Sequence, residues 1–357
     1  GGGLGLNVAS FSGDPVKNIV VYKNKVYDKG NINSTTDEDA TGIAVNAGVS
    51  YCWILDNEIY NTSGSGIQIL AGSRSQMSTV HHIYVGRNHV YRTRQAGIWS
   101  KESVDSVFSQ NTVHDVINTS WSPSKGMGFQ YGPERLWIIF NHIYDCTFGV
   151  AAMSSSGGTG QEAFIVGNVI HDIHHANDGT GFFAPNSGWS NAGIMLVGVP
   201  KHYIVNNTIY NVDAGINSPG PNALYMENNI IANVTEANCQ HVYIENSPNN
   251  SWMKNGLFYQ NGQDVRIRWG STKYTLGSFQ SATGKATNCL NVDPKFVNPA
   301  ADDFHLQSSS PAINKGLTSQ VFDRFQSIHG IDIRKDLEST KRPLGGAWDI
   351  GAYEFKQ

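Results

Sequence analysis

The chain has 357 residues, of which 15% are charged, and its formal net charge is −4. Such a weak negative charge gives no general attraction to nucleic acid, so we expect no nucleic-acid partner. No apolar run reaches the roughly 18 residues that a membrane-spanning helix needs, so we expect no membrane-spanning segment. The chain begins at Gly1 and not at Met, and we expect that a signal peptide has been removed.

An Asn recurs along the chain, usually ahead of Val or Ile and then Tyr or His, as in Asn57-Glu-Ile-Tyr60 and Asn141-His-Ile-Tyr144. The positions are Asn24, Asn57, Asn88, Asn111, Asn141, Asn168, Asn207, Asn229 and, with a weaker match, Asn255. Successive Asn residues are 22 to 39 positions apart. A repeat with a fixed minimum and additions of unequal length indicates a solenoid whose coils carry loops of different sizes.

The segments between turns alternate apolar and polar residues, as in 49–56 and 82–86. This period of two, with many β-branched and aromatic residues, predicts short strands. One such unit cannot bury its apolar side alone, so the units must stack. The sequence therefore predicts one stacked coil of about nine or more rungs.

The repeated Asn has two readings. Asn is common at turns, which explains its presence but not its fixed offset before an apolar residue. On an inward turn its amide can donate to one rung and accept from the next, so that a ladder satisfies every buried member. We predict the inward ladder.

The four cysteines, Cys52, Cys146, Cys239 and Cys289, show no metal-ligand spacing. We expect buried thiols at Cys52 and Cys146. Cys239 and Cys289 flank the end of the repeat and could form a disulfide.

The Asn motif does not recur after Asn255. From about Gln263 the sequence has no repeating motif, and it ends in Asp349-Ile-Gly-Ala-Tyr-Glu-Phe355. This ending resembles the C-terminal segment of secreted bacterial right-handed parallel β-helix proteins of the pectate-lyase-like superfamily. The resemblance implies an all-β, right-handed parallel β-helix in residues 1–262. It also implies final rungs and a non-repeating cap in 263–357, and a secreted or cell-surface bacterial protein. It implies no particular activity.

Loops of unequal length collect on one face of a solenoid, which is often the binding face. The long insertions are residues 28–41, 71–79, 117–125, 154–162 and 174–192. The largest contains His174, His175 and Trp189, which we expect to contact sugar rings. The alternative is that its aromatic residues pin the loop to the rod.

Aligning the strands that follow each Gly places two columns of side chains on the outside of the coil. Polar and aromatic character concentrates where Trp99, Lys101, Gln130 and Tyr131 occur. The expected cationic cluster adds Arg92, Arg94 and Arg135. A cationic cluster between long loops is what an acidic polysaccharide requires.

Cleavage of a uronan by β-elimination requires a cation at the carboxylate, a base for the C5 proton and an acid for the leaving oxygen. Lys101 is the candidate base if neighbouring Arg charges lower its pKa, and Tyr131 or Arg135 is the candidate acid. The fragment Ser100-Lys-Glu-Ser103 followed by Gln130-Tyr-Gly132 is similar to the active-site rungs of alginate and chondroitin lyase β-helices. Their Arg-His-Gly is replaced here, which leaves the second catalytic role open, and an exposed Lys on a solvated strand remains the alternative.

A second column competes with the first. Asp115, Asp145 and Asp172 follow the Asn phrase on consecutive rungs. Carboxylates one rung apart would be about 5 Å from each other, near the separation in retaining glycosidases. The alternative is that these carboxylates cap turn N–H groups.

Hard oxygen ligands for Ca²⁺ occur at Asp37-Glu38-Asp39 and around Asp178, although neither has an EF-hand pattern and exposed acids are commonly just solvated. The leading hypothesis is a secreted, monomeric lyase of an acidic polysaccharide. A glycoside hydrolase that uses the Asp column, and a non-catalytic glycan-binding or adhesive rod, are the alternatives.

Overall fold

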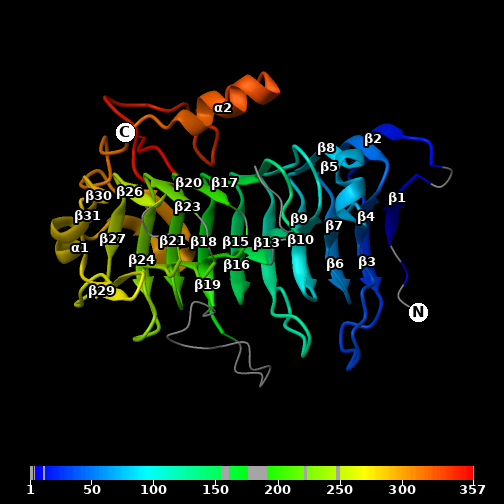
Figure 1. Cartoon of the computed structure of the whole chain (residues 1–357), viewed down its shortest axis with the longest axis horizontal. Coiled ribbons are helices and arrows are strands. Elements are labelled where there is room, and N and C mark those ends of the chain that lie inside the picture. The colour runs from blue at the N-terminus through cyan, green and yellow to red at the C-terminus, as the bar shows by residue number, and fades with distance from the viewer. Residues whose placement is uncertain are drawn as a thin grey trace.

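The computed structural model describes residues 3, 5–10, 13–153, 161–175, 191–198, 200–220, 223–246 and 250–356. Its strands coil into a parallel β-helix, in which every third strand along the chain joins the same sheet (Figure 1). The predicted fold class is therefore confirmed. In the described part of the chain, no helix has the length and apolar character needed to cross a membrane.

Three long sheets form the sides of the coil. Sheet A contains β1 (Leu6–Val8), β4 (Ile43–Asn46), β7 (Ile67–Leu70), β10 (Ala96–Lys101), β13 (Lys125–Gln130), β16 (Phe148–Met153), β19 (Ala192–Leu196), β22 (Ile216–Ser218), β25 (Val242–Ile244), β28 (Ile267–Trp269) and β29 (Thr272–Tyr274). Sheet B contains β2 (Val16–Tyr22), β5 (Val49–Leu55), β8 (His81–Gly86), β11 (Val107–Ser109), β14 (Leu136–Ile139), β17 (Glu162–Val166), β20 (Lys201–Val205), β23 (Ala223–Glu227), β26 (Trp252–Lys254) and β30 (Ala286–Thr287). Sheet C contains β3 (Lys25–Lys29), β6 (Glu58–Thr62), β9 (His89–Thr93), β12 (Thr112–His114), β15 (His142–Cys146), β18 (Val169–Ile173), β21 (Thr208–Val212), β24 (Ile230–Val234), β27 (Leu257–Tyr259) and β31 (Leu290–Asn291).

The remaining elements lie on or beyond these sheets. They are the helices α1 (Leu276–Thr283) and α2 (Gln320–His329), the 3₁₀ turns η1 (Arg74–Thr79) and η3 (Pro299–Ala301), and the antiparallel pair β32 (Phe296–Asn298) and β33 (Asp303–Leu306).

The Asn ladder forms at the turn from sheet B to sheet C. The backbone N–H and the side-chain amide of Asn57 both donate to Oδ1 of Asn88, at 3.0 and 2.9 Å. The same pair of bonds joins each further rung as far as Asn207 and Asn229. The residue before each Asn is left-handed, for example Asp56 with φ 55°, which turns the chain sharply and points the Asn inward. The predicted ladder is confirmed.

The ladder ends one rung earlier than predicted. Leu257 pairs with Ile230, so Gly256, and not Asn255, follows Asn229 in the column. Asn255 occupies the left-handed position with φ 49°, and its side chain donates to the carbonyl of Lys315 at 2.7 Å. The prediction for Asn255 was wrong because Asn is also favoured in left-handed turns.

The interior is a continuous stack of aliphatic side chains from all three sheets. At the start of the sheet A strands the backbone approaches this stack closely. A Cβ on Gly97 would lie 2.3 Å from Val113 Cγ1 and 2.7 Å from the carbonyl oxygen of Gly126, so only glycine fits there. All four cysteines are buried thiols, and no disulfide joins Cys239 to Cys289.

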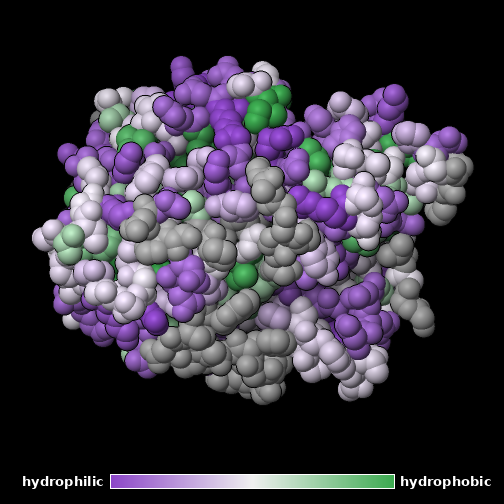
Figure 2. Space-filling model, viewed as in Figure 1, coloured by the Kyte–Doolittle hydropathy of each residue, from purple (hydrophilic) through white to green (hydrophobic). Residues whose placement is uncertain are grey.

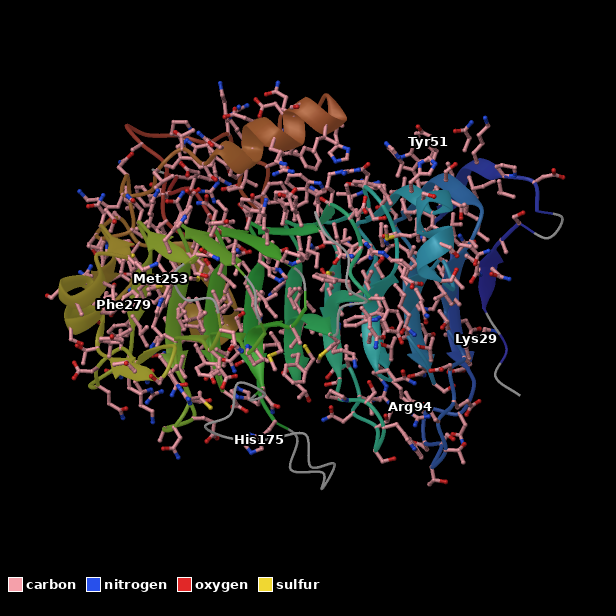
Figure 3. The ribbon with its side chains drawn as sticks, in the orientation of Figure 1. Lys29, Tyr51, Arg94, His175, Met253 and Phe279 are labelled. Atoms are coloured by element: carbon pink, nitrogen blue, oxygen red, sulfur yellow. The ribbon has the colours of Figure 1, made fainter. Side chains whose placement is uncertain are left out.

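The C-terminal end of the coil is covered by residues 272–283. Strand β29 pairs antiparallel with β28 and stops the parallel stacking. Helix α1 follows, and its Phe279 packs on Trp269 with ring centroids 4.8 Å apart (Figure 3). The antiparallel β29 thus occupies the edge of β28 that would otherwise be open to a parallel strand of another chain.

Residues 292–356 run back along the outside of the coil instead of covering its end. Helix α2 lies across sheet B (Figure 1), where Phe325 meets the Trp137 ring edge-to-face at 4.9 Å. Beyond α2, Gly351 N–H donates to the Asn228 carbonyl at 2.8 Å, and Arg342 and Glu354 form a buried ion pair at 2.8 Å. Residues 292–356, which belong to the segment 263–357 predicted to contain final rungs and a cap, therefore pack against a side of the coil.

Histidine and tyrosine rings stack along the outer face of sheet C. His114 lies between Tyr91 and Tyr144, with centroid separations of 5.3 and 4.7 Å. His142 lies beside them, and its Nε2 is 2.7 Å from Nε2 of His171. Burial, followed by His171 and then His114, lowers the pKa of His142 to about 4.

We expect acid to destabilise the protein through His142. Because its folded pKa is lowered from 6.5 to about 4, the unfolded chain binds its proton first. The contribution of neutral His142 to the free energy of unfolding is complete above pH 6.5. It is lost as the pH falls towards 4, by about 3 kcal/mol in total. Denaturant unfolding of wild type and His142→Thr at the two ends of this range measures the difference, Thr being the neighbouring residue in this column at position 112. Equal acid losses in both proteins would contradict the assignment.

Candidate active site

A cavity of about 430 Å³ lies on the outer face of sheet A, over β7, β10, β13 and β16. Its walls combine strand residues with residues of the 28–41 and 117–125 insertions. The lining residues are Asp39, Ser65, Gln68, Gln95, Ala96, Trp99, Lys101, Ser122, Pro123, Lys125, Gln130, Phe148 and Met153. Two of the five insertions predicted to wall a groove therefore do so.

Three outward columns of sheet A form the floor. The register stacks Gln68 beside Trp99 in one column, and Lys101, Gln130 and Met153 on three successive rungs in the other. These are the two columns predicted from the sequence. The third column holds Ala96, Lys125 and Phe148.

Trp99 forms the apolar base of the cavity and is 4% exposed. The next residue in its column is Gly128, where a Cβ would lie 2.8 Å from the Trp99 ring and 1.8 Å from the Ala151 carbonyl oxygen. Because Gly128 has no side chain, the Trp99 indole fits beside it without a steric clash. The small exposed part of the indole gives the cavity an apolar base with polar groups around it.

Lys125 is the most perturbed basic group of the cavity. Its Nζ donates to Ser122 Oγ and to the Pro123 carbonyl, both at 2.6 Å, and lies 5.4 Å from the centre of the Trp99 ring. Burial, followed by the positive charge of Lys101, lowers the pKa of Lys125 to about 7. A substantial fraction of this amine is therefore neutral near pH 7 and can accept a proton.

The polar rim is held by hydrogen bonds from Gln95. Its side-chain nitrogen donates to Asp39 at 2.6 Å and to Asp37 at 3.3 Å. These bonds fix the 28–41 insertion against β10. The cavity therefore offers two amines, from Lys101 and Lys125, one carboxylate, from Asp39, and neutral hydrogen-bonding groups such as Gln68 and Gln130.

The arginines expected in this cluster lie elsewhere. Arg94 is 2% exposed, and its guanidinium donates to the carbonyls of Asn31 and Thr36 at 3.4 Å, so it holds the 28–41 insertion (Figure 3). Arg92 is exposed on sheet C and donates to Asn61 at 3.0 Å. Neither arginine lines the cavity, and the lowered pKa in the cavity is that of Lys125, which is caused by burial and then by Lys101.

Tyr131 and Arg135 also lie outside the lining. Tyr131 is 38% exposed and has a left-handed backbone with φ 62°, which turns the chain away directly after Gln130. Arg135 forms an ion pair with Asp105 at 2.5 Å on the side of sheet B. Neither candidate acid therefore lines the cavity that contains Lys101.

Of the predicted sugar contacts in the largest insertion, His174 and His175 lie within the described residues. His174 and His175 follow β18 and both bind Asp213; they do not line the cavity. Trp189 lies outside the described residues, as do Asp178 and most of the 154–162 insertion.

The Asp column forms on adjacent strands of sheet C, as the sequence predicts. Asp115, Asp145 and Asp172 all have left-handed backbones, with φ from 48 to 52°. Asp115 accepts from His114 at 2.8 Å and Asp172 from His171 at 2.6 Å. Burial, followed by Asp115 and Asp172, raises the pKa of Asp145. None of the three lines the cavity on sheet A.

The carboxylates of Asp37, Glu38 and Asp39 do not converge on a common point. Asp37 and Asp39 share the Gln95 amide, while Glu38 accepts from the backbone of Asn31 at 3.2 Å. Within the described ranges, the groups of three potential metal ligands that lie close together occur at other positions.

Lys125 is the residue that sequence reasoning missed. The two predicted columns begin after the Gly of each rung, whereas Lys125 comes directly before Gly126. The residue before this Gly is Thr41, Ser65, Ala96, Lys125, Phe148, Ala192 or Ala214 on successive rungs. A single charge in a column of small and apolar residues was the available signal.

Fold and cavity together define a parallel β-helix protein with a lysine-containing pocket on the outer face of one sheet. No protein-family profile matches the chain, and no curated protein matches it. Among solved structures it is similar to pectate lyase Pel9A, with 13% identity, a TM-score of 0.56, and coverage of 98% of this chain and 86% of that one. It also matches the complex of XylC with xylose, with 10% identity, a TM-score of 0.42, and coverage of 89% and 66%. At these identities the similarity to Pel9A supports the fold.

Proposed function

We propose that the protein binds an acidic polysaccharide in the cavity on sheet A and cleaves it by β-elimination. The observation that carries the proposal is Lys125, whose pKa is lowered to about 7 inside a cavity that also contains Lys101. The fold shared with a pectate lyase agrees with this activity.

Each step of the reaction has a group or solvent to perform it. Lys101 pairs with the uronate carboxylate and so acidifies the C5 proton, and Trp99 supports the sugar ring. Neutral Lys125 takes the C5 proton, the electrons of that bond form the C4–C5 double bond, and the C4–O4 bond breaks. The leaving O4 takes a proton from solvent. The proposal therefore moves the role of base from Lys101 to Lys125.

The hydrolase alternative depends on Asp145, whose pKa is raised as a general acid requires. Its column lies on sheet C and does not line the cavity. A glycan-binding rod would need only the aromatic base of the cavity.

Incubation with alginate, pectin, glycosaminoglycans and neutral glycans distinguishes these functions. We expect ultraviolet absorbance from an unsaturated uronate product with at least one acidic glycan. New reducing ends without that absorbance would contradict elimination and favour the hydrolase. Binding without either product would favour the rod.

A further inference from the structure

A cluster of two imidazoles and two carboxylates lies at the turn from sheet C to sheet A, away from the proposed active site. The register pairs Ile173 with Val212, and Val212 with Val234. The turn residues after these positions therefore stack on three consecutive rungs. They are His174 and His175, then Asp213, then Thr235 and Glu236, and His175 is at the lower edge of the rod in Figure 3.

Asp213 is the centre of the cluster. Its side chain is 3% exposed, and its two oxygens lie 2.9 Å from His174 Nδ1 and 2.8 Å from His175 Nδ1. His175 Nδ1 is also 3.9 Å from Glu236 Oε1. The ligand atoms of His175, Asp213 and Glu236 all lie within 4.8 Å of one another.

The frame that holds these atoms is fixed by other bonds. Thr235 Oγ1 donates to Asp213 Oδ1 at 3.0 Å, and the His175 backbone N–H donates to Oδ2 at 2.7 Å. Arg266 donates to the Glu236 carbonyl at 3.1 Å and so holds the backbone beneath that carboxylate. The cluster is therefore built on rigid rungs.

We propose that His175, Asp213 and Glu236 bind a divalent transition-metal ion such as Zn²⁺. In a tetrahedral zinc site with bonds of about 2.0–2.1 Å, ligand atoms lie about 3.3 Å apart. The separations of the three atoms here bracket that value. The ion would take the place of the hydrogen bond between His175 and Asp213, with the imidazole proton on Nε2 or released to solvent. Imidazole with carboxylates suits Zn²⁺ and its neighbours, whereas Ca²⁺ takes oxygen ligands. The outer bonds to Asp213 orient it as a metal ligand requires.

The alternative is a hydrogen-bonded cluster that only anchors the chain after β18. Both a metal site and a hydrogen-bonded anchor would be present in the folded protein without metal. Only the metal site is expected to bind Zn²⁺. The metal proposal does not depend on the proposed function, because none of these residues lines the cavity.

Calorimetric titration of the EDTA-stripped, full-length chain with Zn²⁺ tests the proposal. We expect one ion per chain and a higher melting temperature with metal. Glu236→Gln should weaken binding about tenfold or more without changing the melting temperature of the stripped protein. The matched control, Glu245→Gln, changes an exposed Glu outside the cluster and should bind as wild type.

Co²⁺ provides a second readout, since its visible absorption reports ligand number and type. We expect a d–d spectrum for wild type that Glu236→Gln alters. Absence of Zn²⁺ binding, or equal affinity in wild type and Glu236→Gln, would overturn the proposal and leave the hydrogen-bonded anchor.

Discussion

Lys125→Met is expected to reduce the turnover of an acidic polysaccharide by about 10²- to 10⁴-fold, the usual contribution of a positioned general base. Met is unbranched and of similar length, so the cavity floor stays filled, while the amine that accepts the C5 proton is lost. Lys125→Arg should be equally inactive, because a guanidinium does not lose its proton in this range. The measurement is the initial rate of unsaturated product at saturating substrate.

The matched control is Lys254→Met. Lys254 also lies over a tryptophan ring, at 4.2 Å from the centre of Trp252, but on sheet B. It should retain wild-type turnover. If Lys125→Met also kept full turnover, Lys125 would not be the base.

The same assignment predicts the pH profile. Lys125 must be neutral to act, so turnover should rise with pH through about 7 and then level off. Lys101 lowers the pKa of Lys125, so Lys101→Ala should move this limb to higher pH while weakening substrate binding. A limb that stays in place in Lys101→Ala would contradict the coupling between the two lysines.

Asn141→Ala should be strongly destabilising, by about 3 kcal/mol or more. Oδ1 of Asn141 accepts from the backbone and the side chain of Asn111, both at 2.9 Å, and its amide donates to the Phe108 carbonyl at 3.0 Å. The substitution leaves these buried groups of two rungs without their partner. Denaturant unfolding at neutral pH measures the loss.

Asn255→Gly is the control for this prediction, because glycine keeps the left-handed backbone at this position without strain. Asn255 belongs to the repeat by its sequence but lies outside the ladder, and its side chain donates to the Lys315 carbonyl in an exposed hydrogen bond. We expect a loss below about 1 kcal/mol, the usual value for a single exposed hydrogen bond. Similar losses in both variants would contradict a stabilising role for the ladder.

The repeat made much of the fold predictable. In a stacked coil a fixed offset from each ladder Asn becomes a column in space, so the columns through Trp99 and Lys101 and through the three aspartates could be read from the sequence. The exception at Asn255 has a local cause, since a left-handed turn and an inward ladder both favour Asn.

The site was harder to predict, because a column does not say which way a turn residue points. Arg92 and Arg94 are two positions apart, yet one is exposed on sheet C and the other is buried under an insertion. The candidacy of Lys125 depends on the 117–125 insertion, which buries its amine. Ser122 and Pro123 of this insertion accept its hydrogen bonds. Burial by a loop of irregular length is not encoded in the repeat.

The pKa of Lys125 is the property on which the proposed chemistry depends most directly. It can be measured by following the lysine ¹³Cε resonances with pH, using Lys125→Met to assign the signal. We predict a midpoint near 7, well below the usual lysine value of about 10.4. A midpoint at the usual value would mean that the amine stays charged at neutral pH, and would contradict its role as the base.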